Sequence, residues 1–411
     1  MVKRIGRLCR AIGVALACAL LVGACGSTSR SSAGAESMAS MKPITIPYST
    51  IQTADSPQGA AFRAFAEEVS TRTGGKVTFQ PFFSGSLAPG DATLSGLKSG
   101  VVGAALLVPS YYPQQLPVSN ALLNLGSLPH STYPHGMIAS SAAVMQFQTR
   151  NEALKQELGS NNVRILIAYQ SEVGFNLLCT KSVDSLQDAR GLRVRVGGGA
   201  WVRELEAMGM VPVQLPALET YEGLQRGVVD CVTATTSSMI SFGYWDVAKH
   251  YIPVSMSPSN NSTQVINTEV WESLPRDAQA IVTEAAHTWW KTERVGALAT
   301  YAKFATEGPS RHGVVFHDPA PFDEVLRKHQ AGVVSTVSAS GPPKTDPAAF
   351  VDGYRSLIEE WSGTATKALG TPEPSKDAKA ILESYTAAQQ MNYAEWDAIT
   401  KKELFDAGSA R

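Results

Sequence analysis

The 411-residue sequence predicts an α/β fold made of two lobes joined by a hinge, with one long helix that spans both lobes. Three observations lead to this prediction. Strand-like runs alternate with helical runs within residues 42–108 and again within residues 163–236, and this alternation is typical of parallel sheets covered by helices. The third observation is the apolar stripe of residues 275–310, which keeps helical spacing over about 50 Å at about 1.5 Å per residue.

The first unit contains three strands and two helices. The strands are expected at residues 42–50, 76–82 and 101–108, with helices at residues 60–73 and 90–100. In the first helix Phe62, Phe65 and Val69 recur at helical spacing, and Gly74 and Gly75 end it. The third strand is too uniformly apolar for an exposed edge, so we expect it inside a parallel sheet.

The second unit repeats this order, and the chain then returns to the first. Residues 163–169 read as a strand that continues in residues 174–180, and residues 260–271 read as the return strand. Two crossings between lobes allow a hinge and a cleft. We therefore expect lobe I at residues 42–165 plus 260–274, lobe II at 166–259, the spanning helix at 275–310, and C-terminal helical segments packing on the lobes at 311–411.

The first 25 residues are predicted to be a targeting segment. Four basic residues precede 14 mostly apolar ones, and that apolar run is too short to span a bilayer. The sequence VGAC at residues 22–25 resembles a bacterial lipoprotein box, in which Cys25 would carry the lipid. The alternative is an ordinary secretory signal in which Cys25 is incidental. Residues 26–41 are small and polar, and they predict a flexible tether.

Charge and residue spacing exclude several functions. The chain has 35 Lys and Arg, four of them in the leader, against 36 Asp and Glu. The remainder is therefore acidic, at about −5, which argues against nucleic acid or an anionic membrane surface as a partner. The seven histidines have no metal-type spacing, and no serine or cysteine lies in a nucleophile motif. We expect no metal, no cofactor and no catalysis.

The stretch from residue 191 to residue 230 predicts a carboxylate site. An alternating strand carries Arg195 near its end, a glycine turn follows, and a helix begins directly after it. The free N–H groups and dipole of a helix N-terminus favour an anion, and a guanidinium fork binds a carboxylate with two hydrogen bonds. We expect Gly198 to lie closest to the ligand. The alternative for Arg195 is a structural salt bridge with Glu204 or Glu219.

The same stretch carries a family resemblance. The sequences GLRVRV, EAMGMVPVQLP and ETYEGLQRGVVD are similar to the solute receptors of tripartite ATP-independent periplasmic (TRAP) transporters, typified by four-carbon dicarboxylate receptors. The likeness extends from residue 44 to about residue 310, in the family's order. It implies a periplasmic-binding-protein clamshell in which Arg195 clamps the carboxylate of the ligand.

Two positions depart from the sialic-acid receptors of that family. Phe175 stands where those relatives carry a second arginine, and Ala234 stands where they carry an asparagine. Both changes remove polar groups, so we expect a monocarboxylate with an apolar body. The other residues that we expect at the cleft are hydroxyl-bearing Thr233 and Thr235, aromatic Tyr112 and Trp201, and Gln52 and Ala217 on loops.

Two cysteines remain after the leader and Cys25. Cys179 ends an apolar strand and Cys231 begins another. An even pair in an exported protein is compatible with a disulfide, and the resemblance implies that the two strands are neighbours. The alternative, two buried thiols on facing strands, stays open.

These observations predict a lipid-anchored extracytoplasmic receptor. It would close over a small organic acid and deliver it to a TRAP-type membrane permease. Two alternatives come from other classes: a sensory lipoprotein that presents its ligand to a membrane kinase, and an exported α/β enzyme.

Overall fold

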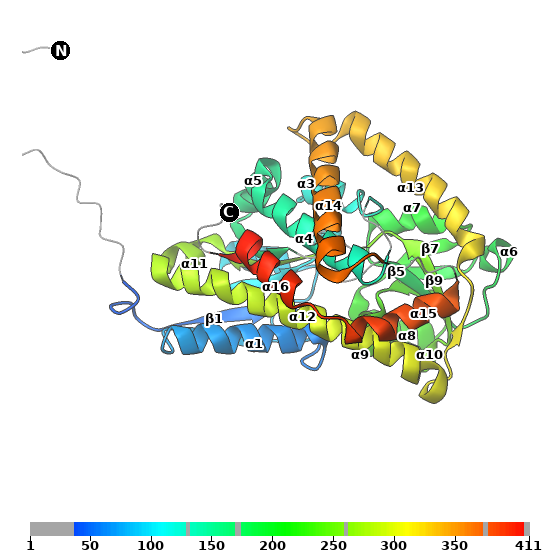
Figure 1. Cartoon of the computed structure of the whole chain (residues 1–411), viewed down its shortest axis with the longest axis horizontal. Helices are drawn as coiled ribbons and strands as arrows, with labels where there is room; N and C mark the ends of the chain where they lie inside the picture. Colours follow the sequence, from blue (N-terminus) through cyan, green and yellow to red (C-terminus); the bar gives the residue numbers. More distant parts are fainter. Residues whose placement is uncertain (1–36, 129–131, 169–173, 259–261, 373–376, 407–411) are drawn as a thin grey trace, which may run out of the picture. The chain divides into compact units, whose positions relative to one another are not determined.

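Two mixed sheets and the helices around them form the body of the protein (Figure 1). The computed structural model describes residues 37–128, 132–168, 174–258, 262–372 and 377–406. The predicted signal peptide, Cys25 and the tether up to residue 36 lie outside these residues. The last tether residues already join the body, because Met41 is buried and the backbone N–H of Met38 donates to the Asp277 carboxylate at 3.0 Å.

The first sheet has the strand order β2-β1-β3-β10-β4. Its strands are β1 (Ile44–Ser49), β2 (Val77–Phe82), β3 (Ala104–Leu107), β4 (Val163–Ala168) and β10 (Thr263–Asn267). The three strands of the predicted first unit are parallel, and the return strand β10 runs antiparallel between β3 and β4. The boundary expected after residue 165 falls inside β4, because β4 pairs with β10 as far as Ala168.

The second sheet has the order β11-β9-β5-β8-β6-β7. Its strands are β5 (Phe175–Cys179), β6 (Arg193–Val196), β7 (Val211–Gln214), β8 (Cys231–Ala234), β9 (His250–Met256) and β11 (Val315–Phe316). β6 is parallel to β7 and β8, whereas β5 is antiparallel to β8 and β9. β5 is thus a strand of a different sheet from β4, not its continuation.

The helices pack on the faces and edges of these sheets (Figure 1). The longer ones are α1 (Pro57–Arg72), α4 (His135–Arg150), α5 (Glu152–Ser160), α7 (Gly199–Ala207), α12 (Arg276–Arg311), α13 (Ala320–Ser340), α14 (Pro347–Leu369) and α15 (Ala378–Ala387). The shorter ones are α2 (Thr93–Ser99), α3 (Pro117–Leu123), α6 (Leu186–Ala189), α8 (Thr220–Gln225), α9 (Thr236–Ser241), α10 (Tyr244–Val247), α11 (Thr268–Ser273) and α16 (Ala394–Thr400). Short helical turns occupy η1 (Pro109–Tyr111), η2 (Ala217–Glu219), η3 (Ala388–Gln390) and η4 (Lys401–Phe405).

The 36-residue helix α12 contacts elements of both sheets. It packs along α1 beside the first sheet, and it also touches α9 and β11 beside the second. Trp289 of α12 is 1% exposed and packs on Phe62 and Phe65 of α1, with ring centroids 5.2 Å and 4.8 Å away. The rest of this core continues through α4 and α14, so the C-terminal helices share the core of the first sheet.

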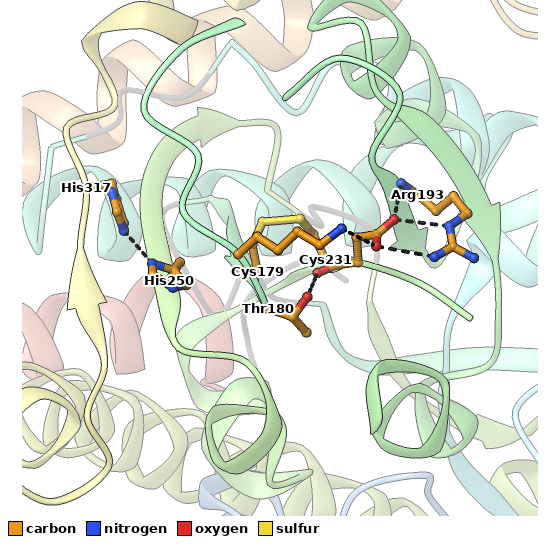
Figure 2. Close-up of a disulfide and its surroundings, with 8 residues drawn as sticks. Cys179, Thr180, Arg193, Cys231, His250 and His317 are labelled. Atoms are coloured by element: carbon orange, nitrogen blue, oxygen red, sulfur yellow. Dashed lines mark hydrogen bonds and ion pairs between the residues drawn. A yellow bond between two sulfur atoms is a disulfide. The ribbon is translucent and has the colours of Figure 1, made fainter. Parts of the chain in front are cut away.

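A disulfide joins β5 and β8 (Figure 2). Cys179 and Cys231 face each other across the two antiparallel strands, and both side chains are fully buried. Beside the bond, Thr180 donates from its N–H and its hydroxyl to the carbonyl oxygen of Asp230, at 2.9 Å and 3.1 Å. The Asp230 carboxylate accepts from the Arg193 side chain at 3.1 Å and 3.2 Å. The disulfide therefore lies beside a hydrogen-bond network formed by Thr180, Asp230 and Arg193 at one end of these strands.

Candidate ligand-binding site

Arg195 is a buried cation on a central strand of the second sheet. It lies on β6, between β8 and β7, and is 5% exposed. Its Nε donates to the carbonyl oxygen of Leu215, just after β7, at 2.9 Å. This bond fixes the guanidinium plane and leaves both Nη groups for another acceptor.

No described carboxylate neutralises Arg195. Within the described ranges, no Asp or Glu oxygen lies within 4.0 Å of its guanidinium. Glu204, one of the two partners considered above, accepts instead from the N–H and hydroxyl of Ser257 and from the Gln330 amide. Glu219, the other, lies exposed on η2. A buried charge without a counter-charge is costly, so this geometry favours an anionic ligand.

The turn after β6 brings backbone close to the guanidinium. A Cβ at Gly197 would lie 3.4 Å from Nη2 of Arg195, and one at Gly198 would lie only 2.6 Å from Cβ of Ser110. Any larger residue at position 198 would push η1 away. Helix α7 begins at the next residue, and the free N–H groups of a helix N-terminus favour an anion.

A cavity of about 110 Å³ lies in front of Arg195, between elements of the two sheets. From the first sheet it receives the loops after β1 and β3 and the start of α1; from the second it receives β5, β6, α7, η2, β8, α9 and α10. Of the lining residues that the structure describes, Arg195 alone carries a charge. The ends of β1, β3, β6 and β8 that face it are carboxyl ends, where α/β sheets bind ligands.

Most of the residues predicted for the cleft lie together in this lining. They are Arg195, Phe175, Trp201, Ala217, Ala234, Thr235 and Gln52. Phe175 and Trp201 stack with ring centroids 4.3 Å apart, and the Trp201 Nε1–H donates to the carbonyl oxygen of Ser257 at 2.6 Å. These two rings give the cavity a rigid apolar wall.

Three predicted residues lie outside the lining. Thr233 is fully buried, and its hydroxyl donates to the backbone oxygen of Arg195 at 3.2 Å, so it joins β8 to β6. Tyr112 packs in a core beside α2, where its hydroxyl accepts from the N–H of Leu94 at 3.1 Å. Gly198, which we expected to lie closest to the ligand, is buried within the turn and does not line the cavity. Thr233 and Tyr112 therefore support the site from behind.

The structure adds residues that the sequence interpretation did not select. Tyr244, Ser110, Ser238 and Gln58 all line the cavity. Burial raises the pKa of Tyr244, although the nearby Arg195 lowers it, and its hydroxyl donates to the carbonyl oxygen of Ala217 at 2.6 Å. Tyr244 lies in the block SFGYWDVAKHYI, one of those that carry the family resemblance, which is the only signal that pointed to it.

A second cavity, of about 300 Å³, lies elsewhere. Its described lining contains Asp318, Asp323 and Asp377 but no Lys, Arg or His, so it would repel a carboxylate. Nor does the described part of the chain hold a group of three or more His, Cys, Asp and Glu placed to bind a metal. In those same residues, no helix is both long and apolar enough to cross a membrane. Of these two cavities, the one at Arg195 is thus the one that suits an organic anion.

A cationic cavity lined by elements of two sheets is the arrangement expected of a two-lobed solute receptor. A family model described as bacterial extracellular solute-binding protein, family 7, matches residues 48–324. This match covers more than half of the chain, and the protein belongs to that family. The family match confirms the predicted receptor class, with a location outside the cytoplasm and a binding role in place of an enzymatic one. The α/β fold is confirmed by the solved structures.

The individual relatives share less than 30% of their aligned residues with this chain. A solute-binding protein of Albidiferax ferrireducens is 29% identical over 192 residues, which cover 46% of this chain and 53% of that protein. The C4-dicarboxylate-binding periplasmic protein DctP of Rhodobacter capsulatus is 25% identical over 296 residues, covering 69% of this chain and 85% of that one. The chain thus spans about half the length of the first relative and most of the second.

Among solved structures, a TRAP solute-binding protein from a marine metagenome has the same fold. That protein is described as specific for pyroglutamate and comes from an unidentified microbe. The TM-score is 0.63 with 22% identity, and the match covers 77% of this chain and all of the other. At this identity, the likeness establishes the fold alone.

Proposed function

We propose that this protein is a receptor that captures an organic monocarboxylate between its two lobes and delivers it to a TRAP-type membrane permease. The lobes are the units built on the two sheets, and the cavity at Arg195 is the binding site. The observation that carries the proposal is the buried guanidinium of Arg195, which is 5% exposed, without a described carboxylate partner. A ligand carboxylate supplies the missing negative charge.

Charge matching supports a ligand with one carboxylate. Arg195 is the one charged residue of the described lining, and Phe175, Trp201 and Ala234 present apolar surface beside it. A second carboxylate would be desolvated there without a cation to pair with. Similar proteins include receptors for acids with one and with two carboxylates. One relative is named for C4-dicarboxylates, and one protein of the same fold is described as specific for pyroglutamate, a monocarboxylate.

A ligand that contacts both lobes would favour closure of the two lobes over it. The cavity has walls from both, and a ligand stabilises a closed arrangement only by binding it more tightly than an open one. We further propose that Cys25 anchors the receptor to the outer face of the cytoplasmic membrane, where the permease can take up the released acid.

A thermal-shift panel tests the ligand class. Benzoate, butanoate and pyroglutamate are compared with succinate and malate on the purified protein, because a ligand that binds only the folded state raises Tm by mass action. We expect stabilisation by at least one monocarboxylate and by neither dicarboxylate. Stabilisation by succinate or malate alone would contradict the monocarboxylate assignment, and stabilisation by no acid would contradict the receptor proposal. For delivery, the expected result is uptake of the bound acid into vesicles that requires both this protein and the permease.

A further inference from the structure

Gln58 is a polar residue of the cavity lining that the carboxylate site does not use. It is the second residue of α1 and reaches the cavity from the first-sheet side, opposite the strand that carries Arg195. Its side chain is part of the lining but only 8% exposed. A glutamine is seldom so buried unless its amide is hydrogen-bonded.

The amide oxygen of Gln58 accepts no hydrogen bond from the part of the protein that the structure describes. Across the described residues, its Oε1 is buried and receives no hydrogen bond. The hydroxyl groups of the lining are used differently: three of them donate to protein oxygens, namely those of Tyr244, Thr235 and Ser110. Like the Nη groups of Arg195, the Gln58 amide therefore keeps hydrogen-bonding capacity for a bound molecule.

The backbone of Gln58 is held in place before any ligand binds. The Ser56 hydroxyl accepts from the N–H of Gly59 at 3.0 Å and donates to Thr53 O at 2.7 Å. A Cβ at Gly59 would lie 2.5 Å from that same Thr53 oxygen, so only glycine fits this turn. Pro57 packs against Gly296 of α12 so closely that a Cβ at Gly296 would lie 2.8 Å from it. A group fixed in this way loses little freedom on binding.

We infer that Gln58 recognises a neutral distal hydrogen-bonding group of the acid whose carboxylate binds Arg195. This inference rests on the proposed function and narrows its substrate class to monocarboxylates that carry a hydroxyl, carbonyl or N–H group away from the carboxylate. Rotation of the amide by 180° exchanges Oε1 and Nε2, so Gln58 can serve as acceptor or donor. The ligand then has one polar end on each lobe and its apolar body against Phe175 and Trp201.

The test measures affinity ratios in matched pairs of acids. Benzoate is paired with 3-hydroxybenzoate and 4-hydroxybenzoate, and butanoate with 4-hydroxybutanoate, by titration calorimetry on the full chain. In at least one pair we expect the wild type to bind the hydroxy acid about tenfold more tightly, which is about 1.4 kcal/mol. In Gln58→Met we expect that ratio to fall below threefold, while the affinity for the unsubstituted acid changes less than threefold.

Matched variants separate this role from a structural one. Gln80→Met changes an exposed glutamine on β2 of the first sheet, and it should keep the wild-type ratio. Gln58→Leu repeats the measurement if Gln58→Met does not fold. An unchanged ratio in a folded Gln58 variant, or no preference in any wild-type pair, overturns the inference while the receptor proposal stands. If no acid binds the wild type, the receptor proposal fails, and the role of Gln58 fails with it.

Discussion

Replacement of Arg195 by methionine should remove most of the affinity for the cognate acid. The guanidinium is 5% exposed and keeps two Nη groups for the carboxylate, so the lost contact is a desolvated, charge-assisted pair. Truncation of one partner in such a pair costs about 2–5 kcal/mol. This corresponds to an affinity about 30-fold to 4,000-fold weaker. Titration calorimetry with the best acid from the panel measures this directly.

The unliganded variant should remain stable, and this separates a ligand contact from a structural one. Loss of the Nε bond to Leu215 O costs about 1 kcal/mol, whereas removal of a buried charge without a counter-ion relieves a penalty of similar or larger size. We therefore expect a Tm within a few degrees of the wild type.

Arg193→Met is the matched control for this experiment. Arg193 lies two residues earlier on the same strand, but its side chain is 45% exposed and pairs with Asp230. The Arg193→Met variant should therefore bind the acid with unchanged affinity. Binding within threefold of the wild type in a folded Arg195→Met protein would refute the carboxylate site.

Three further predictions concern stability and anchoring. Substitution of both Cys179 and Cys231 by alanine should lower the free energy of unfolding by about 4 kcal/mol, from the 52-residue separation in the chain-entropy model; urea unfolding showing a loss below about 1 kcal/mol would contradict this. Burial raises the pKa of Glu204 above its ordinary value of 4.5, against the hydrogen bonds from Ser257 and Gln330. The stability linked to Glu204 is therefore complete below the unfolded pKa and is lost as pH rises through the folded pKa. In urea unfolding across pH 4–8, the wild type should thus lose free energy of unfolding relative to Glu204→Gln as the pH rises. Parallel plots of this free energy against pH for the two proteins would be evidence against a raised pKa of Glu204. Cys25→Ser should release the protein from membranes in cell fractionation without changing ligand affinity, and unchanged membrane retention would argue for an ordinary secretory signal.

Local patterns were sufficient to predict the parallel part of the first sheet. Strands β1, β2 and β3 follow one another closely in sequence, so alternation and apolar runs were enough to predict them. The separation of β4 from β5 was not predictable in this way. Both runs are apolar and adjacent in the chain, and β4 is assigned to its sheet by β10, which lies about 100 residues later.

Most residues predicted for the site lie together in one cavity, and there are physical reasons why some were found and others were not. Arg195 was identified because a charged residue at the end of a strand before a glycine turn is locally conspicuous. Thr233 and Ala234 are consecutive on β8, and successive strand residues point to opposite faces, so both could not line the same cavity. Gln58 carries no sequence signal, since a single glutamine in the first turn of a helix is ordinary until the fold places it at the cavity.

The disulfide closes a covalent ring around Arg195, the residue proposed to bind the ligand carboxylate. The chain between Cys179 and Cys231 includes β6, α7, β7 and α8, and thus Arg195 and its partner Leu215. A protease that cuts once within this ring leaves both halves joined through the sulfur atoms. The nicked protein would run as a full-length band on a non-reducing gel and separate into fragments only after reduction. In an extracytoplasmic space that contains proteases, a single cut in this segment would not detach Arg195 from the rest of the receptor.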